Sequence, residues 1–324
     1  MEKLLTIIIS VFKVEDYINK CLDSLIVPSE LMQKLEVIIV NDGSPDKSAE
    51  MSREYVKRYP GTFRQIDKEN GGHGSTWNIG LREATGKFIR FLDSDDWITN
   101  LDKLMLDLEG CEADIIYNPF IKEYSSENRM DVVDVPVVRK IERIDPGHLF
   151  QLGYNNVNFW GATYKTKILK PLLPLFAEKT TFDDFILTWA PLVHGRTYIS
   201  LNYPVYHYLI GRSGQSMSST HQRKGATAYV KCFEQYESVR SRIDVEAVPS
   251  DLLNCIEDSI VGYANYIFPY MVYLPLKEAQ SRMTYLWRKY LSSKPDKSNL
   301  LKRYSKMPGI VFYYFEHLRR KIRN

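Results

Sequence analysis

The chain lacks the features that mark several specialised classes of protein. Its four cysteines stand far apart and form no CxxC pair, so the sequence predicts neither a zinc site nor a disulfide framework. No apolar run approaches the ~20 residues that span a bilayer, and the first residues lead straight into an apolar strand instead of a signal peptide. We therefore expect a cytoplasmic globular protein whose cysteines are small core residues: Cys21, Cys111, Cys232 and Cys255.

An excess of charge of one sign is also absent. Lysine and arginine total 43 against 40 acids, and the formal net charge of +3 is too small to indicate a nucleic-acid partner. With 324 residues, of which 44% are hydrophobic, the chain can form one large domain or two smaller ones. Aromatic residues make up 13%, led by 22 tyrosines, a content that suits sugar binding, an interface or a large core.

Apolar, β-branched segments alternate with segments of helical spacing over the first hundred residues. This alternation predicts an open parallel sheet with right-handed crossovers and helices on both faces. The expected strands are 4–10, 35–40, 63–67 and 87–92, and the expected helices are 15–27, 47–58 and 73–85.

Chemically suggestive residues follow each of these strands. Residues 10–13 follow the first, Asp42 follows the second, a glycine-rich loop at 71–74 follows the third, and three acids at 93–96 follow the fourth. Because parallel strands end at the same edge of a sheet, all four groups are expected at one crevice.

The fourth strand ends in three carboxylates within four residues: Asp93, Asp95 and Asp96. Carboxylates held so close repel one another, and a divalent cation such as Mg²⁺ or Mn²⁺, completed by a diphosphate, would compensate them. The alternative is an acidic turn that caps the next helix through Asp96 or Asn100. The pattern alone leaves both open.

The glycine-rich loop Gly71-Gly72-His73-Gly74 does not fit a dinucleotide fingerprint. That fingerprint follows the first strand, whereas here the first strand is followed by Val11-Phe12-Lys13, without a glycine. The glycines either let the backbone approach a ligand or form the entrance of a helix, and His73 is either a binding residue or a satisfied loop histidine.

The second half of the chain predicts more strands and then helices. Strands are expected at 113–117, 159–164, 197–201 and 205–210, with an antiparallel excursion over 124–139. Asp183 and Asp184 stand at the start of an apolar helix expected at 185–193. Either they interact favourably with the dipole of this helix, or one of them is a general base. Helices follow near 222–242, 250–270, 276–291 and 308–322; the last is basic and amphipathic, either a solvated face or a contact with an anionic membrane.

Four motifs, in order and spacing, resemble glycosyltransferase family 2, in particular bacterial capsule and exopolysaccharide transferases with the GT-A fold. They are Thr6–Phe12, Val37–Ser44, Glu69–Gly72 and Phe91–Trp97. The resemblance covers residues 4–100 strongly and 155–218 more weakly. It implies a GT-A domain at 1–218, with a nucleotide-sugar half (1–110) and an acceptor half (111–218), followed by a helical region at 219–324 for which membrane association is one interpretation.

The resemblance implies an inverting enzyme that uses a UDP-sugar and a divalent metal. Asp42 would hydrogen-bond the uracil, Asp93 would lie by the ribose and sugar, and Asp95 with Asp93 would hold Mn²⁺ or Mg²⁺. Asp184 would be the base, with Asp183 where glutamate is usual. Arg212, or alternatively His207, would meet the diphosphate. The complete set of implied nucleotide-sugar contacts is Ser10, Val11, Phe12, Asp42, Gly71, Gly72, His73, Asn78, Asp93, Ser94 and Arg212.

The chain departs from the family pattern in two places. Val11, Phe12 and Lys13 replace the usual Pro-x-Tyr-Asn, and Ser75-Thr76-Trp77-Asn78 lacks the usual arginine. The implied acceptor is a glycan, by analogy a lipid-linked oligosaccharide at the inner membrane face, and a homo-oligomer is possible. The alternatives are a nucleotidyltransferase, which would need a basic glycine-rich loop after the first strand, and a catalytically silent scaffold with the same fold.

Overall fold

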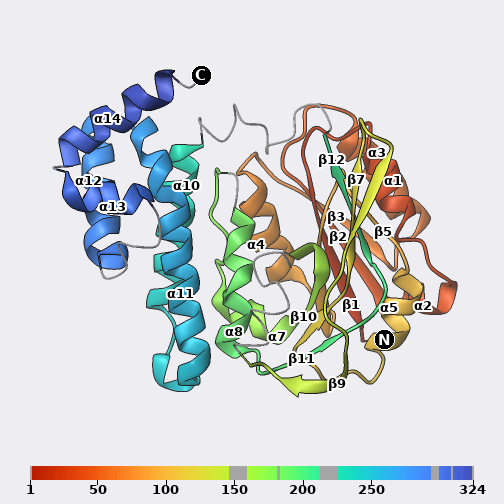
Figure 1. The fold of residues 1–324 in the computed structure, drawn as a ribbon. Helices are drawn as coiled ribbons and strands as arrows, with labels where there is room; N and C mark the ends of the chain where they lie inside the picture. Colours follow the sequence, from red (N-terminus) through yellow and green to blue (C-terminus); the bar gives the residue numbers. More distant parts are fainter. Residues whose placement is uncertain are drawn as a thin grey trace.

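The computed structural model describes residues 2–145, 159–180, 183–211, 225–292, 299–307 and 309–322. An eight-stranded sheet forms the centre of the molecule, a four-stranded sheet lies beside it, and a group of helices forms the C-terminal part (Figure 1). The expected boundary between 218 and 219 lies outside the described residues.

The large sheet has the strand order β3-β2-β1-β4-β10-β6-β11-β9. Strands β1 to β4 are parallel, and every residue of β1 and β2 is buried, because apolar runs fill both faces of a central parallel strand. Strands β9 and β10 run antiparallel to their neighbours, so the sheet is mostly parallel, as predicted. The strands are β1 (Leu5–Val11), β2 (Leu35–Asn41), β3 (Phe63–Asp67), β4 (Phe88–Asp93), β6 (Ile115–Tyr117), β9 (Val138–Arg143), β10 (Ala162–Lys165) and β11 (Thr197–Ser200).

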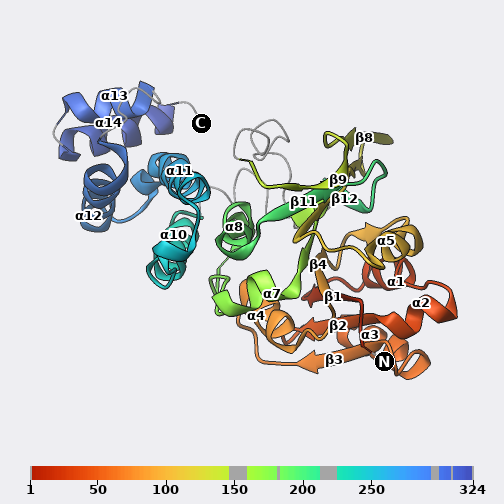
Figure 2. The ribbon, with the colours of Figure 1, turned by 90° about the horizontal axis from the view of Figure 1, so that it is seen from below.

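Helices cover both faces of this sheet. Figures 1 and 2 show α4, α7 and α8 on one side and α1, α2, α3 and α5 on the other. Helix α4 lies very close to β1, since a Cβ added at Gly80 would be only 2.2 Å from Cγ2 of Ile8. The helices are α1 (Ile18–Asp23), α2 (Ser29–Lys34), α3 (Ser48–Arg58), α4 (His73–Glu83), α5 (Leu101–Leu108), α7 (Thr166–Leu169) and α8 (Ala190–His194).

The smaller sheet has the order β5-β12-β7-β8. Strands β7 and β8 pair antiparallel, which confirms the antiparallel excursion expected in this region, while β12 runs parallel to β7 and antiparallel to β5. The short strand β5 directly follows the acidic residues, so this sheet is tied to the end of β4. The strands are β5 (Trp97–Ile98), β7 (Phe120–Tyr124), β8 (Arg129–Val133) and β12 (Tyr206–Ile210).

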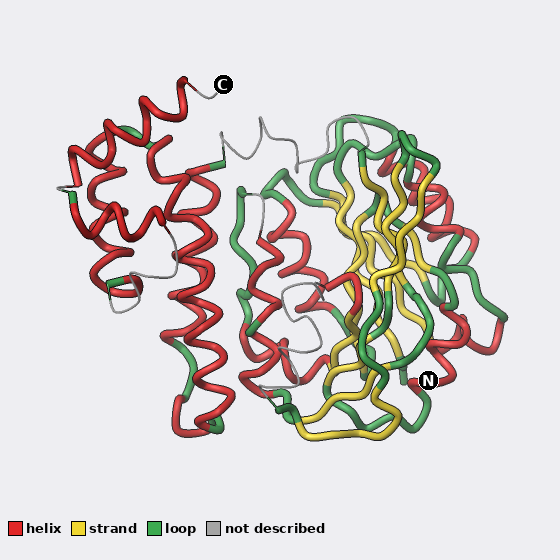
Figure 3. Tube along the Cα trace, viewed as in Figure 1, coloured by secondary structure: helices red, strands yellow, loops and turns green. Residues whose placement is uncertain are grey.

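The C-terminal helices lie beside α8 (Figure 3), and aromatic side chains form contacts between the two parts of the chain. The rings of Trp189 and Tyr236 lie 5.9 Å apart, and Phe185 lies 5.5 Å from Tyr263. Within the described part of the chain, no helix is both long and apolar enough to cross a membrane. The elements are α10 (Ala226–Ser241), α11 (Ser250–Ile267), α12 (Leu276–Leu286), α13 (Asn299–Lys306) and α14 (Gly309–Ile322).

Several expected helices are shorter than the apolar spacing predicts. The helix expected at 15–27 is only α1, and α2 begins after Pro28, because a proline and its preceding residue disfavour a continuous helix. The helix expected at 185–193 is instead a 3-10 helix, η3 (Asp183–Thr188), followed by α8, with Pro191 in its first turn. The helix expected at 276–291 changes to a π-helix at Trp287–Leu291, and α13 was not expected.

Candidate functional site

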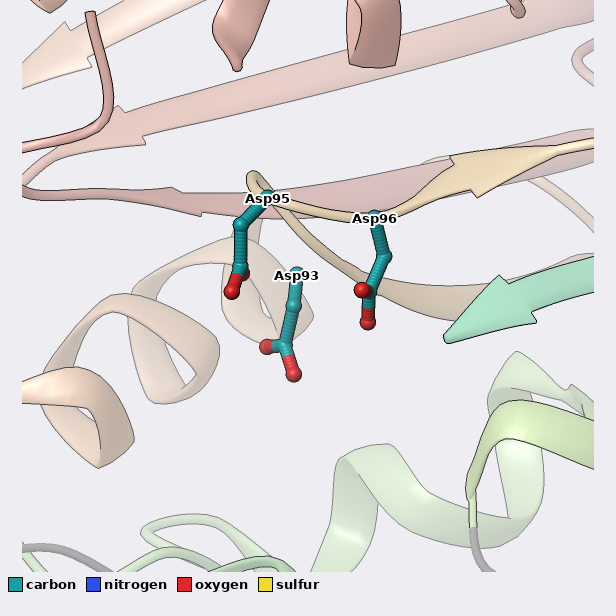
Figure 4. Close-up of side chains that lie close together, drawn as sticks. All are labelled: Asp93, Asp95 and Asp96. Atoms are coloured by element: carbon teal, nitrogen blue, oxygen red, sulfur yellow. The ribbon is translucent and has the colours of Figure 1, made fainter. Parts of the chain in front are cut away.

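The acid turn, Asp93 to Asp96, stands at the carboxyl end of β4. One carboxylate oxygen from each of Asp93, Asp95 and Asp96 lies within 4.8 Å of the others, and Figure 4 shows the three side chains extending to the same side of the turn. Ser10 pairs with Asp93 in the sheet, and Val11 pairs with Asn41. The strand ends that precede Asp42 and the acid turn are therefore neighbours of β1, as the sequence predicts.

Asp96 holds the turn in place rather than facing a ligand. Its Oδ2 accepts a hydrogen bond of 2.6 Å from the Tyr206 hydroxyl, and its Oδ1 accepts one of 2.8 Å from the Leu209 amide. Burial raises the pKa of Asp96 well above its usual range, and the charges of Asp95 and Asp93 raise it further. The capping alternative fails, because the N-cap of α5 is Asn100, whose side chain donates to the Pro204 carbonyl instead.

The remaining acids of the turn fit a divalent cation. Asp93 and Asp95 offer carboxylate oxygens, the ligand type that Mg²⁺ and Mn²⁺ prefer, and such ions commonly keep positions for phosphate oxygens and water. With Asp96 engaged by β12, Asp93 and Asp95 are the residues of this turn that would hold the ion. This is the pair that the sequence predicts for the metal.

Asp42 fixes the glycine-rich loop. Its Oδ1 accepts hydrogen bonds from the Gly71 amide (2.8 Å) and the Lys68 ammonium (2.6 Å), and its Oδ2 accepts one from the Gly72 amide (2.8 Å). The carboxylate is buried, and Gly72 has a φ of +83°, a conformation that glycine adopts without strain. Asp42 therefore positions the loop, and its predicted contact with uracil would have to be made beside these three bonds.

His73 connects the two halves of the site. Its Nε2 lies 3.1 Å from Oδ1 of Asp93, and its Nδ1 lies 3.1 Å from Oδ1 of Asp183. Although desolvation alone would lower it, the two carboxylates raise the pKa of His73 well above its usual value, with the charge of Asp183 as the largest raising cause. His73 is thus held by a carboxylate on each side, as the interpretation of a satisfied loop histidine expects, and its contact with a nucleotide sugar stays a prediction.

Asp183 and Asp184 are adjacent but differ in environment. Asp183 is 2% exposed and bound to His73, whereas Asp184 is partly exposed. Burial raises the pKa of Asp184 to about 7, with the charge of Asp183 as a further cause. A carboxylate with a pKa near neutrality can accept a proton from a hydroxyl group more effectively than an ordinary aspartate. Of the two predicted catalytic acids, Asp184 has the properties of the base.

Asn78 makes contacts inside the protein instead. Its amide donates to the Phe176 carbonyl and to Glu178, and its Oδ1 accepts from the amides of Leu175 and Phe176. These four bonds use the full capacity of the side chain, which is 1% exposed. A direct side-chain contact between Asn78 and the nucleotide sugar is therefore contradicted by the geometry, because the amide is already used to hold the segment before Asp183.

The other predicted contacts divide by exposure. Phe12, which follows β1, is 40% exposed, whereas Ser10, Val11 and Ser94 are buried, so any contact that these three make with a ligand is through small exposed areas or the backbone. Arg212 lies outside the described residues. Its alternative, His207, stacks on Trp97 at 5.2 Å, and burial lowers its pKa, so it is a poor cation for a diphosphate.

Tyr206 positions the acid turn, a role that the sequence does not predict. Besides its bond to Asp96, its hydroxyl accepts a hydrogen bond of 3.1 Å from the Asp93 amide, so it fixes both ends of the acid turn. The sequence does show that Tyr206 and Tyr208 alternate in a strand and therefore share one face of it. Nothing in a single sequence indicates that this face meets the acids.

Gly74 permits the close approach of the segment that precedes the catalytic acids. A Cβ at this position would lie 2.0 Å from the Ala177 carbonyl oxygen and 2.7 Å from Oδ2 of Asp183. We expect Gly74→Ala to lower the free energy of unfolding by about 2–3 kcal/mol, as overpacking against backbone does. The matched control is Gly262→Ala in α11, where a Cβ meets nothing within 4 Å and helix propensity predicts a gain of about 0.5–1 kcal/mol. Urea denaturation of both variants checks this, and equal effects would contradict it.

Taken together, the structure is that of an α/β protein whose parallel strands end at one edge, where an acid turn suited to a cation is joined through His73 to the segment of Asp183 and Asp184. The family model described as Glycosyl transferase family 2 matches residues 6–168, which is half of the chain. The chain belongs to glycosyltransferase family 2.

Curated relatives agree with this assignment. The provisionally named glycosyltransferase EpsH of Bacillus subtilis is 30% identical over 68% of this chain and 64% of its own. The poly(ribitol-phosphate) β-N-acetylglucosaminyltransferase TarS of Staphylococcus aureus is 25% identical over 79% of this chain and 43% of its own. The chain therefore spans less than two thirds of the length of these relatives.

Solved structures show the same fold at low identity. The structure of S. aureus TarS 1–349 in complex with UDP-GlcNAc matches with a TM-score of 0.58 and 17% identity, covering 90% of this chain and 91% of that chain. The mannosyltransferase PcManGT from Pyrobaculum calidifontis, in complex with GDP-Man and Mn²⁺, matches with a TM-score of 0.52 and 15% identity. The match covers 98% of this chain and 88% of that chain. These likenesses confirm the predicted GT-A fold.

Proposed function

We propose that the protein is an inverting, metal-dependent glycosyltransferase that moves a sugar from a UDP-sugar to a glycan acceptor. The observation that carries the proposal is the linked arrangement of the acid turn and the base segment, in which His73 joins Asp93 to Asp183 while the neighbouring Asp184 stays partly exposed. The family gives the reaction class, and the TarS complex with UDP-GlcNAc supports a uridine nucleotide.

Three of the predicted residues carry the chemistry of this proposal. A bound divalent cation would neutralise the charge that develops on the departing diphosphate, and Asp93 with Asp95 would hold it. Asp184 accepts the proton of the attacking hydroxyl. A single displacement needs one base and no covalent nucleophile, and the configuration at the anomeric carbon is inverted.

The proposal is tested by release of UDP from UDP-GlcNAc and UDP-glucose, with membranes of capsule-producing bacteria as acceptor. We expect release that stops with EDTA and returns with Mn²⁺. Release of pyrophosphate from a nucleoside triphosphate would favour the nucleotidyltransferase instead. Absence of any nucleotide binding would favour the silent scaffold.

His73 is expected to affect turnover more than nucleotide binding. Without the imidazole, Asp93 and Asp183 lose their common partner, so the base segment is no longer fixed relative to the acid turn. His73→Ala should lower kcat about 100-fold while changing the affinity for UDP with Mn²⁺ less than 5-fold. His194→Ala, at the end of α8, is the control. Equal losses in kcat and in UDP affinity would show that His73 binds the nucleotide directly.

We also propose that the C-terminal helix lies on an anionic membrane, close to a lipid-linked acceptor. Helix α14 exposes Val311, Tyr314 and Phe315 on one face, whereas Phe312 and Tyr313 are buried. Apolar and aromatic side chains on one helix face, near basic residues, favour binding at a lipid surface. The exposed Lys306 of α13 and the basic residues that follow Glu316 in the sequence supply such charge.

The membrane proposal predicts a loss of vesicle binding. Replacing Val311, Tyr314 and Phe315 together by serine should reduce sedimentation with phosphatidylglycerol vesicles at least 10-fold. The reason is that these three side chains no longer enter the membrane interface. Phosphatidylcholine vesicles, which lack net charge, should bind the unchanged protein weakly. Undiminished sedimentation of the triple variant would contradict the proposal.

A further inference from the structure

Two stacked aromatic rings beside the acid turn have no role in the site as described so far. Trp160, in the 3-10 helix η1 (Phe159–Gly161), and Tyr208 of β12 have ring centroids 4.3 Å apart and planes inclined by 18°. Both side chains are partly exposed. Resting on the proposed function, we propose that this pair, the Trp160–Tyr208 platform, binds the sugar ring of the nucleotide sugar while it is transferred.

The strand register places Tyr208 across from the acid turn. Strands β12 and β5 are antiparallel, with Tyr206 opposite Ile98 and His207 opposite Trp97, and the same register puts Tyr208 opposite Asp96. The hydrogen bond from the Leu209 amide to Asp96 fixes this alignment. Burial raises the pKa of Tyr208, and the charges of the acid turn and of Asp184 raise it further. The register and the Leu209 bond therefore place Tyr208 beside the acid turn.

An aromatic floor connects the platform to the other side of the site. His73 packs on Trp77 at 4.1 Å, Trp77 on Phe159 at 4.8 Å, and Phe159 on Trp160 at 5.3 Å. Trp77 and Phe159 are buried, so the Trp160–Tyr208 platform is the accessible end of the series. Rigid aromatic rings held by neighbours lose little entropy when a ligand binds.

The backbone under Trp160 is fixed by a buried arginine. Arg90 of β4 is 0% exposed; its guanidinium donates to the Trp160 carbonyl and, at 2.7 Å, to the Thr163 hydroxyl. A wholly buried cation is costly and persists only where such bonds compensate it. The position of Trp160 is therefore set by the same strand that ends in Asp93.

The chemistry of transfer indicates that the ligand of the Trp160–Tyr208 platform is the transferred sugar ring. The bond from the anomeric carbon to the diphosphate oxygen breaks, with the electron pair leaving on UDP, while a bond to the acceptor oxygen forms and its proton passes to Asp184. The transferred ring must therefore lie between the acids that hold the diphosphate and Asp184. A pyranose has a face of axial C–H bonds that packs against an aromatic face, and such contacts are favourable beyond the area they bury.

The test compares UDP with the UDP-sugar that binds most tightly to the unchanged protein, chosen among UDP-GlcNAc, UDP-glucose and UDP-galactose, by calorimetry with Mn²⁺. Trp160→Leu and Tyr208→Leu keep apolar bulk but remove the aromatic face, and each should weaken binding of the UDP-sugar about 10-fold and of UDP less than 2-fold. Trp160→Phe should retain most of the affinity. Tyr285→Ala, at an exposed tyrosine of α12, is the control and should change neither affinity.

Two results would overturn the platform: an unchanged affinity for the UDP-sugar in both leucine variants, or an equal loss for UDP and the UDP-sugar. Thermal unfolding of each variant separates a lost contact from a lost fold, and Tyr208→Phe, which keeps the ring, should bind as the unchanged protein does. Failure of the unchanged protein to bind any of these nucleotides would instead contradict the proposed function itself.

Discussion

Asp184→Asn should lower kcat for sugar transfer at least 100-fold and leave the affinity for UDP with Mn²⁺ unchanged. The amide cannot accept the proton of the attacking hydroxyl, and general-base catalysis contributes about 10²–10⁴ in rate. Because the bonds of His73 to Asp93 and Asp183 do not involve Asp184, the substitution should leave the acid turn and the nucleotide contacts in place. The measurement is steady-state release of UDP beside calorimetric titration with UDP.

The pH dependence gives a second check on Asp184. The base is active when deprotonated, and its pKa is about 7, so kcat/KM should rise with pH and level off above about 7. An ordinary aspartate, with a pKa near 3.9, would give a flat profile over this range. A flat profile between pH 5 and 8, or undiminished turnover of Asp184→Asn, would contradict the assignment.

The raised pKa also predicts a gain in stability on substitution. Folding raises the pKa of Asp184, so its folded form binds a proton more tightly than the unfolded chain, and its contribution to stability falls as pH rises from about 4 to about 7. At pH 8 the buried charge opposes folding. Asp184→Asn removes that charge, and urea denaturation at pH 8 should show a gain of about 1–2 kcal/mol, less than the full shift implies because the carboxylate is partly exposed.

Asp95→Ala should abolish metal-dependent turnover, with a loss of at least 1000-fold in kcat/KM. Asp95 and Asp93 are the acids of the turn proposed to hold the cation, because Tyr206 and Leu209 bind both carboxylate oxygens of Asp96, whereas His73 binds Oδ1 of Asp93. Without the cation, charge on the departing diphosphate is not compensated, which removes the largest electrostatic contribution. Asp131→Ala, an acid of the edge strand β8, is the control.

The two acids Asp95 and Asp96 should behave differently. Asp96→Asn keeps acceptor and donor groups near Tyr206 and removes a charge whose burial is costly, so folding and metal binding should largely survive. Turnover by Asp95→Ala within 10-fold of the unchanged protein, under excess Mn²⁺, would contradict the metal role of Asp95. Equal losses in both variants would show that all three acids hold the ion.

The N-terminal sheet could be predicted because its signals are local. Buried strands such as Leu5–Val11 and Leu35–Asn41 are continuous apolar runs, and their parallel order places Asp42 and Asp93 at one edge. Helix lengths were predicted less well, because prolines at 28, 191 and 269 end or change helices that the apolar spacing would continue.

The contacts that organise the site could not be predicted in the same way. His73 and Asp183 are 110 residues apart, and Tyr206 and Asp96 are also 110 apart, so their contacts depend on how distant segments pack. The same packing turned Asn78, predicted as a ligand contact, into a structural residue. Residue types indicate the chemistry that is available, but only tertiary packing decides which polar groups remain open to a ligand.

The central claim is that the edge with Asp42 and the acid turn binds a metal together with a uridine nucleotide, and thermal unfolding with UDP and Mn²⁺ tests it most directly. Ligand at 100 times its Kd stabilises the folded state by about 2.7 kcal/mol. We predict that UDP with Mn²⁺ raises the Tm by several degrees, that either alone does little, and that Asp95→Ala abolishes the effect. A Tm unchanged by the pair, or raised equally in Asp95→Ala, would contradict the account.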